Sequence, residues 1–432
     1  MRVERLPVDG DPAGAAARVR ALAPIPPSVE GDVAEILAMV RDRGDQALLE
    51  LTRRLDTQGA EPRPLRVTRK ELEAALAALD PELSEALELA ARNVRGIART
   101  GQDFETAGRE GQSIRLRRIP VRRAGVYAPA GRAPYPSTVV MGVMVARAAG
   151  VEEIVVCAPP GPDGEAHPVM LAACTICDAN EVYRMGGAQA IAALAYGTHS
   201  VAPVDVIVGP GNPYVQEAKR QLAGRVGIDG IAGPSELLVL LDGDSPVRLV
   251  ALDLLAQAEH GRDSLVAAAS PSPEALDALE AELAALAPDR PTVQAAACAL
   301  VHTADLGEAL AFAESLAPEH LQLMGAGPEA LARQVRSAGC LFVGASSATA
   351  FGDYVAGSNH ILPTGGAARF ASALGPSLFR RRMAEVRIGR AAGALAGPGT
   401  AIARSEGFFV HAESMEARAA EDDAPMGENR GP

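Results

Sequence analysis

Aromatic residues are scarce in this chain. It contains no tryptophan, and aromatic residues make up only 3% of its 432 residues. Proteins that bind single-stranded nucleic acid stack bases on aromatic rings, so the scarcity argues against such a surface. Basic residues are also outnumbered, with 41 Lys and Arg against 54 Asp and Glu and a formal net charge of −13. An acidic chain repels phosphate backbones, so we expect no nucleic-acid partner.

Long hydrophobic runs are missing as well. No uninterrupted apolar stretch is long enough to span a bilayer. The N-terminal sequence Met-Arg-Val-Glu-Arg-Leu-Pro lacks the apolar core of a signal peptide. We therefore expect a cytoplasmic protein with no membrane partner.

Cysteine is rare, and its count of five is odd, so the chain offers no paired disulfide framework. Cys174 and Cys177 form a Cys-x-x-Cys pair, but no second pair and no nearby histidine completes a zinc site. The surrounding Leu-Ala-Ala-Cys-Thr-Ile-Cys run predicts the buried face of a helix. We therefore interpret both cysteines as structural.

A pattern of apolar strand, glycine-rich turn and helix recurs in the middle of the chain. Residues 204–208 form a predicted strand, Gly209-Pro-Gly211 a turn and residues 214–222 a helix, and the pattern also occurs twice upstream. Such alternation indicates a parallel doubly wound sheet, with ligands at the carboxyl ends of its strands. The turn is only the first part of a dinucleotide-binding fingerprint, so its glycines either help to bind a nucleotide or only form a tight turn.

A second α/β section begins with the apolar predicted strand 236–241. We expect an α/β fold of two Rossmann-like parallel-sheet domains with helical N- and C-terminal extensions. The predicted parts are an N-terminal arm at 1–30, a first α/β domain of 31–124 with 234–370, a second α/β domain at 125–233, and a helical tail at 371–432.

Seven histidines are few enough to be judged singly. His260 follows Gln257 by three residues at the end of a predicted helix, so the two side chains share a face. An amide oxygen and an imidazole nitrogen at that spacing can hold one cation. The alternative is that His260 only interacts with the last carbonyl groups of the helix.

Glu319 and His320 place two proton-handling groups side by side, at what we expect to be the start of a helix. The alternative is a pair on the protein surface. His360 lies in the most site-like loop, residues 352–366, which also carries Asp353 and two glycine clusters. Fixing a glycine-rich loop in one conformation costs conformational entropy, so we expect this loop to have a function.

Glu406 and His411, close to the C-terminus, carry no signal on their own. His167, His199 and His302 have no assigned role. Combined, four of the candidate side chains would provide two imidazole nitrogens and two oxygens to one metal ion. This set suits zinc, although manganese or cobalt would also fit. The four candidate ligands are Gln257, His260, Asp353 and His411.

Seven sequence segments resemble those of histidinol dehydrogenases, and the resemblance extends from about residue 31 to 415. They include Gly-Gly-Ala-Gln-Ala-Ile-Ala-Ala-Leu-Ala-Tyr-Gly, Gln-Ala-Glu-His-Gly and Pro-Glu-His-Leu. The segments are 125–141, 186–197, 208–212, 231–236, 257–261, 318–321 and 352–364. The chain departs from the family pattern in segment 376–404, at Phe408-Phe409 and at Ser358.

The resemblance implies oxidation of L-histidinol through L-histidinal to L-histidine with reduction of two NAD, the last steps of histidine biosynthesis. It implies one zinc ion per subunit on the four candidate ligands, and NAD bound in the second α/β domain by Tyr127, Gln189 and Asn212. It assigns proton transfer to Glu319 and His320. It further implies a homodimer in which Glu406 and His411 reach the active site of the other subunit. The implied substrate contacts are Ser235, Gln257, His260, His320, Asp353, His360, Glu406 and His411.

Three alternatives stay open at this point. One is a related metal- and NAD-dependent dehydrogenase that acts on another small hydroxylated substrate. Another is a cysteine-type aldehyde dehydrogenase, which needs a reactive thiol in a polar cleft, whereas the cysteines here lie in apolar runs. The third is a non-catalytic, zinc-stabilised nucleotide-binding module, which has no need for Glu319 beside His320.

Overall fold

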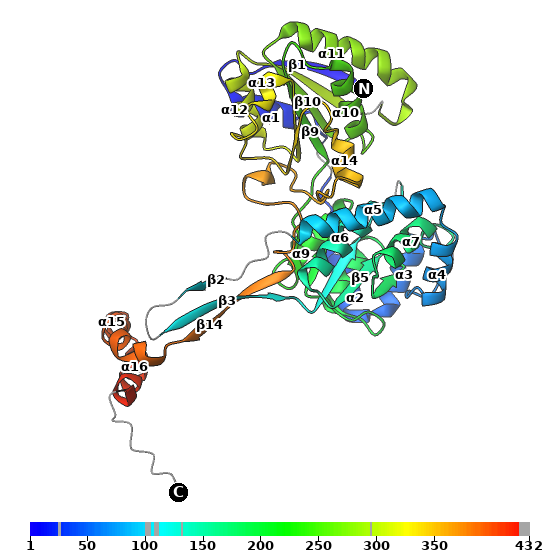
Figure 1. Cartoon of the computed structure of the whole chain (residues 1–432). Helices are drawn as coiled ribbons and strands as arrows, with labels where there is room; N and C mark the ends of the chain where they lie inside the picture. Colours follow the sequence, from blue (N-terminus) through cyan, green and yellow to red (C-terminus); the bar gives the residue numbers. More distant parts are fainter. Residues whose placement is uncertain (25–26, 100–104, 108–111, 131–132, 294–295, 423–432) are drawn as a thin grey trace. The chain divides into compact units, whose positions relative to one another are not determined.

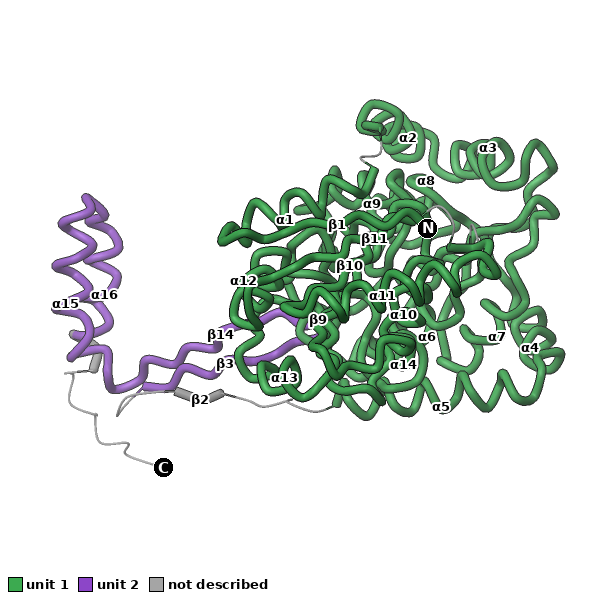
Figure 2. Tube along the Cα trace, turned by 90° about the horizontal axis from the view of Figure 1, so that it is seen from above, with its two compact units in different colours: residues 1–100, 121–379 green, residues 101–120, 380–432 purple. Residues whose placement is uncertain are grey.

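The computed structural model describes residues 1–24, 27–99, 105–107, 112–130, 133–293 and 296–422. The chain divides into two units (Figure 2). Unit 1 comprises residues 1–100 and 121–379, and unit 2 comprises residues 101–120 and 380–432. Across the described residues, no helix combines the length and apolar character needed to cross a membrane.

Unit 1 contains a six-stranded sheet with the strand order β1-β11-β10-β9-β12-β13, and all of its strand pairs are parallel. The strands are β1 (Arg2–Pro7), β9 (Glu236–Leu241), β10 (Leu265–Ser270), β11 (Ala297–His302), β12 (His320–Met324) and β13 (Cys340–Val343). Strands β9 and β10 are buried at every position, as expected for a parallel sheet covered on both faces.

Alternate residues of these strands pack on opposite helical layers (Figure 1). Helices α10 (Val247–Ala258) and α11 (Pro273–Leu286) cover one face. Helices α1 (Pro12–Arg20) and α12 (Leu306–Leu316) cover the other face. The short helices α13 (Ala326–Glu329) and α14 (Thr349–Tyr354) complete this part of unit 1.

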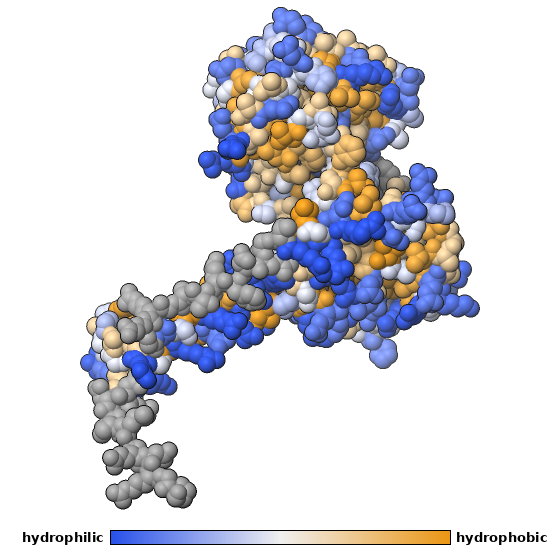
Figure 3. Space-filling model, viewed as in Figure 1, coloured by the Kyte–Doolittle hydropathy of each residue, from blue (hydrophilic) through white to orange (hydrophobic). Residues whose placement is uncertain are grey.

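A five-stranded parallel sheet with the order β6-β5-β4-β7-β8 forms the other half of unit 1. Two helical layers enclose it, and Figure 3 shows many hydrophilic side chains on their outer surface. The strands are β4 (Arg123–Tyr127), β5 (Glu153–Cys157), β6 (Glu181–Tyr183), β7 (Val206–Val208) and β8 (Gly227–Ile228). One layer holds α4 (Arg69–Ala77), α5 (Pro81–Ala98), α6 (Pro136–Ala149) and α7 (Pro168–Ile176), and the other holds α2 (Glu30–Arg43), α3 (Asp45–Leu55), α8 (Gly187–Tyr196) and α9 (Pro213–Leu222).

Unit 2 consists of an antiparallel sheet and a helical pair. Its strands lie in the order β14-β3-β2 and are β2 (Glu105–Ala107), β3 (Ser113–Pro120) and β14 (Arg380–Arg387). Helices α15 (Ala392–Ser405) and α16 (Phe409–Asp422) pack against each other. Unit 2 therefore combines an internal segment, residues 101–120, with the C-terminal residues.

The α/β class with parallel sheets is confirmed, but two segments pack differently from the expected grouping. Residues 1–20, expected as an arm, supply edge strand β1 and helix α1 to the six-stranded sheet, because Val8, Ala15 and Val19 are fully buried there. Helices α2 to α5, expected to share a domain with residues 234–370, instead share their buried cores with the five-stranded sheet.

The expected helix at Glu319-His320 is wrong. Helix α12 ends at Leu316, Ala317 adopts a left-handed conformation with φ 46°, and His320 is the first residue of strand β12. The apolar residues Leu321 and Leu323 are fully buried in the sheet, which explains why this short segment forms a strand.

Candidate active site

A cavity of about 1350 Å³ in unit 1 brings together residues from both parallel sheets. From the five-stranded sheet come residues at or just beyond the carboxyl ends of strands, such as Tyr127 in β4 and Asn212 after β7. From the six-stranded sheet come Ser235 and His320, at the amino ends of β9 and β12. The cavity therefore joins opposite ends of the two sheets, whereas the sequence pattern predicts only the carboxyl ends.

Glu319 and His320 are both buried in this cavity. The Glu319 Oε2 atom accepts hydrogen bonds from the Ser235 hydroxyl at 2.6 Å and from the Glu236 backbone N–H at 2.8 Å. The His320 Nδ1 atom lies 3.5 Å from Glu319 Oε2 and 2.9 Å from the Glu236 carbonyl oxygen. The two side chains are thus oriented by the start of the neighbouring strand β9.

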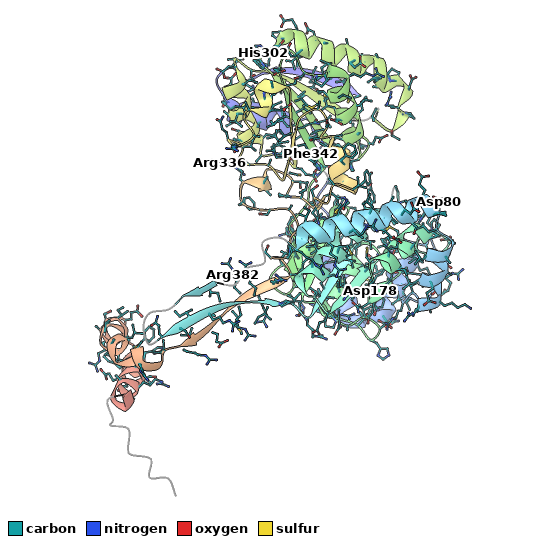
Figure 4. All side chains as sticks on the ribbon, in the orientation of Figure 1. Asp80, Asp178, His302, Arg336, Phe342 and Arg382 are labelled. Carbon is teal, nitrogen blue, oxygen red and sulfur yellow. The ribbon has the colours of Figure 1, made fainter. Side chains whose placement is uncertain are left out.

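His320 also faces Asp353, whose Oδ1 atom lies 3.5 Å from His320 Nε2. Burial by itself lowers the pKa of His320, but the adjacent Glu319 and Asp353 carboxylates outweigh it and raise this pKa well above the usual value. Phe342 packs beside the imidazole with a ring-centroid distance of 5.8 Å, and Figure 4 labels it. The imidazole is therefore held between two carboxylates and an aromatic ring.

His360 connects the loop 352–366 to helix α6. Its Nδ1 atom lies 2.9 Å from the Asp353 carbonyl oxygen, and its Nε2 atom lies 3.1 Å from the Thr138 hydroxyl. The neighbouring Asn359 donates from its side chain to the Met141 carbonyl at 3.1 Å. Burial lowers the pKa of His360, which favours the neutral imidazole. The structure thus places His360 in the same cavity as Glu319 and His320.

Gln257 lies in the last turn of α10, and His260 follows just beyond the helix. The Gln257 side-chain amide donates to the Ser235 hydroxyl at 2.5 Å, and that hydroxyl in turn donates to Glu319. His260 lines the cavity together with Asp353, and its proximity is one of the interactions that lower the Asp353 pKa. An amide, an imidazole and a carboxylate from unit 1 therefore gather around one region, a donor set that fits zinc.

Glu406 and His411, two further predicted site residues, belong to unit 2. Glu406 follows the end of α15, and His411 lies in α16 with its ring centroid 5.2 Å from that of Phe408. Both side chains are exposed. Within the described parts of the chain, no group of three or more His, Cys, Asp or Glu side chains is arranged to hold a metal ion. Of the four predicted zinc ligands, only His260 and Asp353 are both located in unit 1 and of the His, Cys, Asp or Glu type.

Tyr127, Gln189 and Asn212 line the same cavity as Glu319 and His320. The Tyr127 hydroxyl accepts from the Gly187 N–H at 3.2 Å, and the Asn212 side chain caps α9 by accepting from the Val215 N–H at 3.1 Å. Gly209 has φ +117°, and an added Cβ atom would lie 2.0 Å from the Tyr127 carbonyl oxygen. Glycine at this turn therefore lets two strand ends approach each other closely.

Asp56, which the sequence did not single out, also lines the cavity. Its Oδ2 atom accepts from the Gln189 side-chain amide at 3.1 Å, whereas Gln189 Oε1 is buried without a hydrogen-bond partner among the described residues. Burial raises the pKa of Asp56 to about 6. Asp56 follows helix α3 in an ordinary polar segment, so no local motif marks it.

Replacing Asp56 with Asn is expected to stabilise the protein at alkaline pH. The pKa of about 6 in the folded state exceeds the value near 3.9 of an unfolded chain, so the folded state binds this proton more tightly. The carboxylate consequently costs about 3 kcal/mol above pH 6, and this cost fades as the pH falls towards 4. Thermal melts from pH 8 to pH 4.5 measure the effect.

The Asp56→Asn variant should melt above the unmodified protein at pH 8, with a difference that shrinks on acidification. Asp289→Asn, a change at an exposed position, is the matched control and should show no such trend. A stability difference between Asp56→Asn and the unmodified protein that does not depend on pH would contradict the assignment.

All five cysteines are free thiols. Burial raises the pKa of each of them, so none is an activated thiolate. This agrees with the structural interpretation of Cys174 and Cys177, both of which are buried. The thiols therefore offer no support for cysteine-type aldehyde oxidation.

Comparison with known proteins assigns the chain to a family. The family model described as histidinol dehydrogenase matches residues 25–419. Histidinol dehydrogenase of Parasynechococcus marenigrum is 44% identical over 399 residues, which cover 90% of this chain and 91% of the relative. That of Gluconobacter oxydans is 42% identical over 402 residues, with coverages of 90% and 93%. The crystal structure of histidinol dehydrogenase from Elizabethkingia anophelis has a TM-score of 0.91 at 29% identity and covers 98% of this chain and 99% of that chain. The chain thus belongs to the histidinol dehydrogenase family.

Proposed function

We propose that this chain oxidises L-histidinol through L-histidinal to L-histidine with reduction of two NAD, in the last steps of histidine biosynthesis. Membership of a family of NAD-dependent oxidoreductases that act on an alcohol and then an aldehyde supports this proposal. The observation that carries it is the buried Glu319–His320 pair, which shares one cavity with the predicted NAD contacts Tyr127, Gln189 and Asn212. A cytoplasmic location is part of the proposal.

His320 is suited to take the hydroxyl proton of the alcohol as a hydride leaves the adjacent carbon, provided that its imidazole is neutral. Glu319 and Asp353 raise its pKa and favour the protonated form. Zinc bound to Asp353 would withdraw that carboxylate from His320 and so favour the neutral imidazole. A carbonyl oxygen can only accept, so the contact with the Glu236 carbonyl favours a hydrogen on His320 Nδ1. The other nitrogen, Nε2, is then the one that exchanges a proton with the substrate. The same nitrogen would act again when the hydrated aldehyde is oxidised.

Glu319 is suited to activate the water that adds to the aldehyde. Both of its hydrogen bonds described above engage Oε2 and come from Ser235 and Glu236. Among the described residues no hydrogen bond engages Oε1, so this oxygen is available to a water molecule. Keeping both oxidations in one cavity would protect the reactive aldehyde from escape.

The proposal includes one zinc ion per subunit, held by Gln257, His260 and Asp353 of one chain and His411 of a second copy. Zinc is redox-inert, and when bound it would supply a Lewis acid that anchors the imidazole and amino nitrogens of the substrate. Substrate contacts are proposed for the four zinc ligands, for Ser235, His320 and His360 in the cavity, and for Glu406 in unit 2. A homodimer with shared sites accounts for predicted site residues in a separate unit.

An absorbance assay for NADH with L-histidinol tests the proposed activity. We expect two NADH for each histidinol consumed, loss of activity after treatment with a chelator, and recovery on addition of zinc. One NADH per substrate would contradict the second oxidation. Full activity after removal of all bound metal would contradict the zinc requirement.

Replacing His411 with Asn is expected to weaken zinc binding about 100-fold or more, because even groups outside the coordination shell change metal affinity by about 10–100-fold. Metal analysis of the purified variant, after dialysis against a zinc buffer, measures this effect. The matched control is His302→Asn. His302 is exposed at the carboxyl end of β11, and Figure 4 labels it apart from Phe342, which lies in β13 of the same sheet. Unchanged zinc content in the His411 variant would rule this residue out as a ligand.

A further inference from the structure

Glu236 is a buried carboxylate with no part in the proposed chemistry. It begins strand β9, and only 3% of the residue is exposed. Its Oε1 atom accepts from the Arg20 guanidinium at 2.6 Å and from the Gly365 N–H at 2.9 Å. Its Oε2 atom accepts from the Glu319 N–H at 3.2 Å. The side chain therefore links the N-terminal helix α1, the His360 loop and the backbone of Glu319.

The backbone of Glu236 contacts both proposed proton-transfer groups. Its N–H donates to Glu319 Oε2 at 2.8 Å, and its carbonyl oxygen lies 2.9 Å from His320 Nδ1. Side chain and backbone together thus hold the position of the Glu319 main chain, the Glu319 carboxylate and the His320 ring. A displacement of the start of β9 would move all three.

Arg20 supplies the positive charge that pairs with the buried Glu236 side chain. It is the last residue of α1, and 28% of its side chain is exposed. Besides Glu236, its guanidinium donates to the carbonyl of Leu316, the last residue of α12. Without Arg20, the Glu236 carboxylate would be buried with no positively charged partner, which is strongly unfavourable. It would also lie beside the Glu319 carboxylate. Arg20 therefore stabilises both segments that frame Glu319.

We infer that Arg20 and Glu236 are positioning residues that hold Glu319 and His320 in their reacting geometry. The inference rests on the proposed roles of Glu319 and His320. It makes helix α1, expected from the sequence to be part of an arm, a support of the active site. The shape of the Arg20 guanidinium group matters as well as its charge. Its separate N–H groups donate to both the Glu236 carboxylate and the Leu316 carbonyl, which a single ammonium group cannot hold equally well.

Arg20→Met and Arg20→Lys test this inference against the matched control Arg18→Met. Arg18 lies in the same helix, and its guanidinium donates to the Pro7 carbonyl at 2.7 Å without contacting Glu236 or Glu319. We expect Arg20→Met to lower kcat for histidinol oxidation by about 10–100-fold, because small displacements of reacting groups have effects of this size. The KM for NAD should change less than twofold, and Arg20→Lys should recover part of kcat.

Hydrogen exchange supplies a readout that does not depend on the activity. The amides of Glu319 and Gly365 should exchange at least about 10-fold faster in Arg20→Met than in Arg18→Met, because their common acceptor is no longer held. Should Arg20→Met not fold, Arg20→Lys and Glu236→Gln allow the same comparison of kcat and exchange.

Unchanged exchange at both amides in the folded Arg20 variant would overturn the inference, whether or not the protein oxidises histidinol. Equal losses of kcat in the Arg20 and Arg18 variants would overturn it as well. If the unmodified protein fails to reduce NAD with histidinol, the proposed function fails, and faster exchange in Arg20→Met would still support the structural link.

Discussion

Replacing Glu319 with Gln is expected to lower histidinal oxidation by about 10²–10⁴-fold, the usual contribution of a general base, and to affect histidinol oxidation much less. The amide has the same size as the carboxylate, and its oxygen can still accept from Ser235 and Glu236, since both donors engage one oxygen. It cannot take a proton from water, so the step that needs a hydrated aldehyde is the one that suffers.

The two half-reactions are measured separately, with histidinol and with histidinal as the added substrate and NADH absorbance as the readout. Glu85→Gln is the matched control, since Glu85 is an exposed glutamate in helix α5. It should leave both rates unchanged. Equal losses in the two half-reactions of Glu319→Gln would contradict the assignment of water activation to Glu319.

Mixing two variants that are each defective in histidinal oxidation is expected to restore this activity if unit 2 completes the site of another subunit. In a dimer of one Glu319→Gln chain and one His411→Asn chain, one site combines both defects and the other contains none. Random pairing makes half of the dimers mixed, so activity should recover to about a quarter of the unmodified level. The variants are co-expressed or mixed under conditions that exchange subunits, and kcat for histidinal oxidation is measured.

The control for mixing is the pair Glu406→Gln and His411→Asn, since both changes lie in unit 2. Every site of their mixed dimers keeps one defect, so no recovery is expected. Absence of recovery with the first pair, under conditions where mixed dimers are demonstrated, would show that each chain completes its own site. The experiment therefore separates a shared site from one built within a single chain.

Short-range features of the site were predictable from the sequence. The adjacency of Glu319 and His320 and the helical spacing of Gln257 and His260 are local, and the structure places all four beside one cavity or on its hydrogen-bond network. The resemblance to histidinol dehydrogenases identified Tyr127, Gln189 and Asn212, and all three line that cavity. Their predicted roles in binding NAD remain proposals.

Other features of the site depend on contacts between residues far apart in the sequence. Arg20 and Glu236 are 216 residues apart, and Thr138 and His360 are 222 apart. No local sequence pattern predicts either of these contacts. Asp56 was missed for the same reason, because only the folded cavity buries it beside Gln189 and raises its pKa.

By itself, the sequence determined the α/β class and the short reactive segments, because hydrophobic periodicity and neighbouring side chains act over one strand or one helical turn. Only the tertiary structure decided that Glu319 and His320 begin a strand, that residues 1–20 complete a sheet, and that the amino ends of β9 and β12 line a cavity with the carboxyl ends of β4 and β7. Those outcomes depend on which apolar faces pack together, since burial of Leu321 and Leu323 in the sheet outweighs local preference.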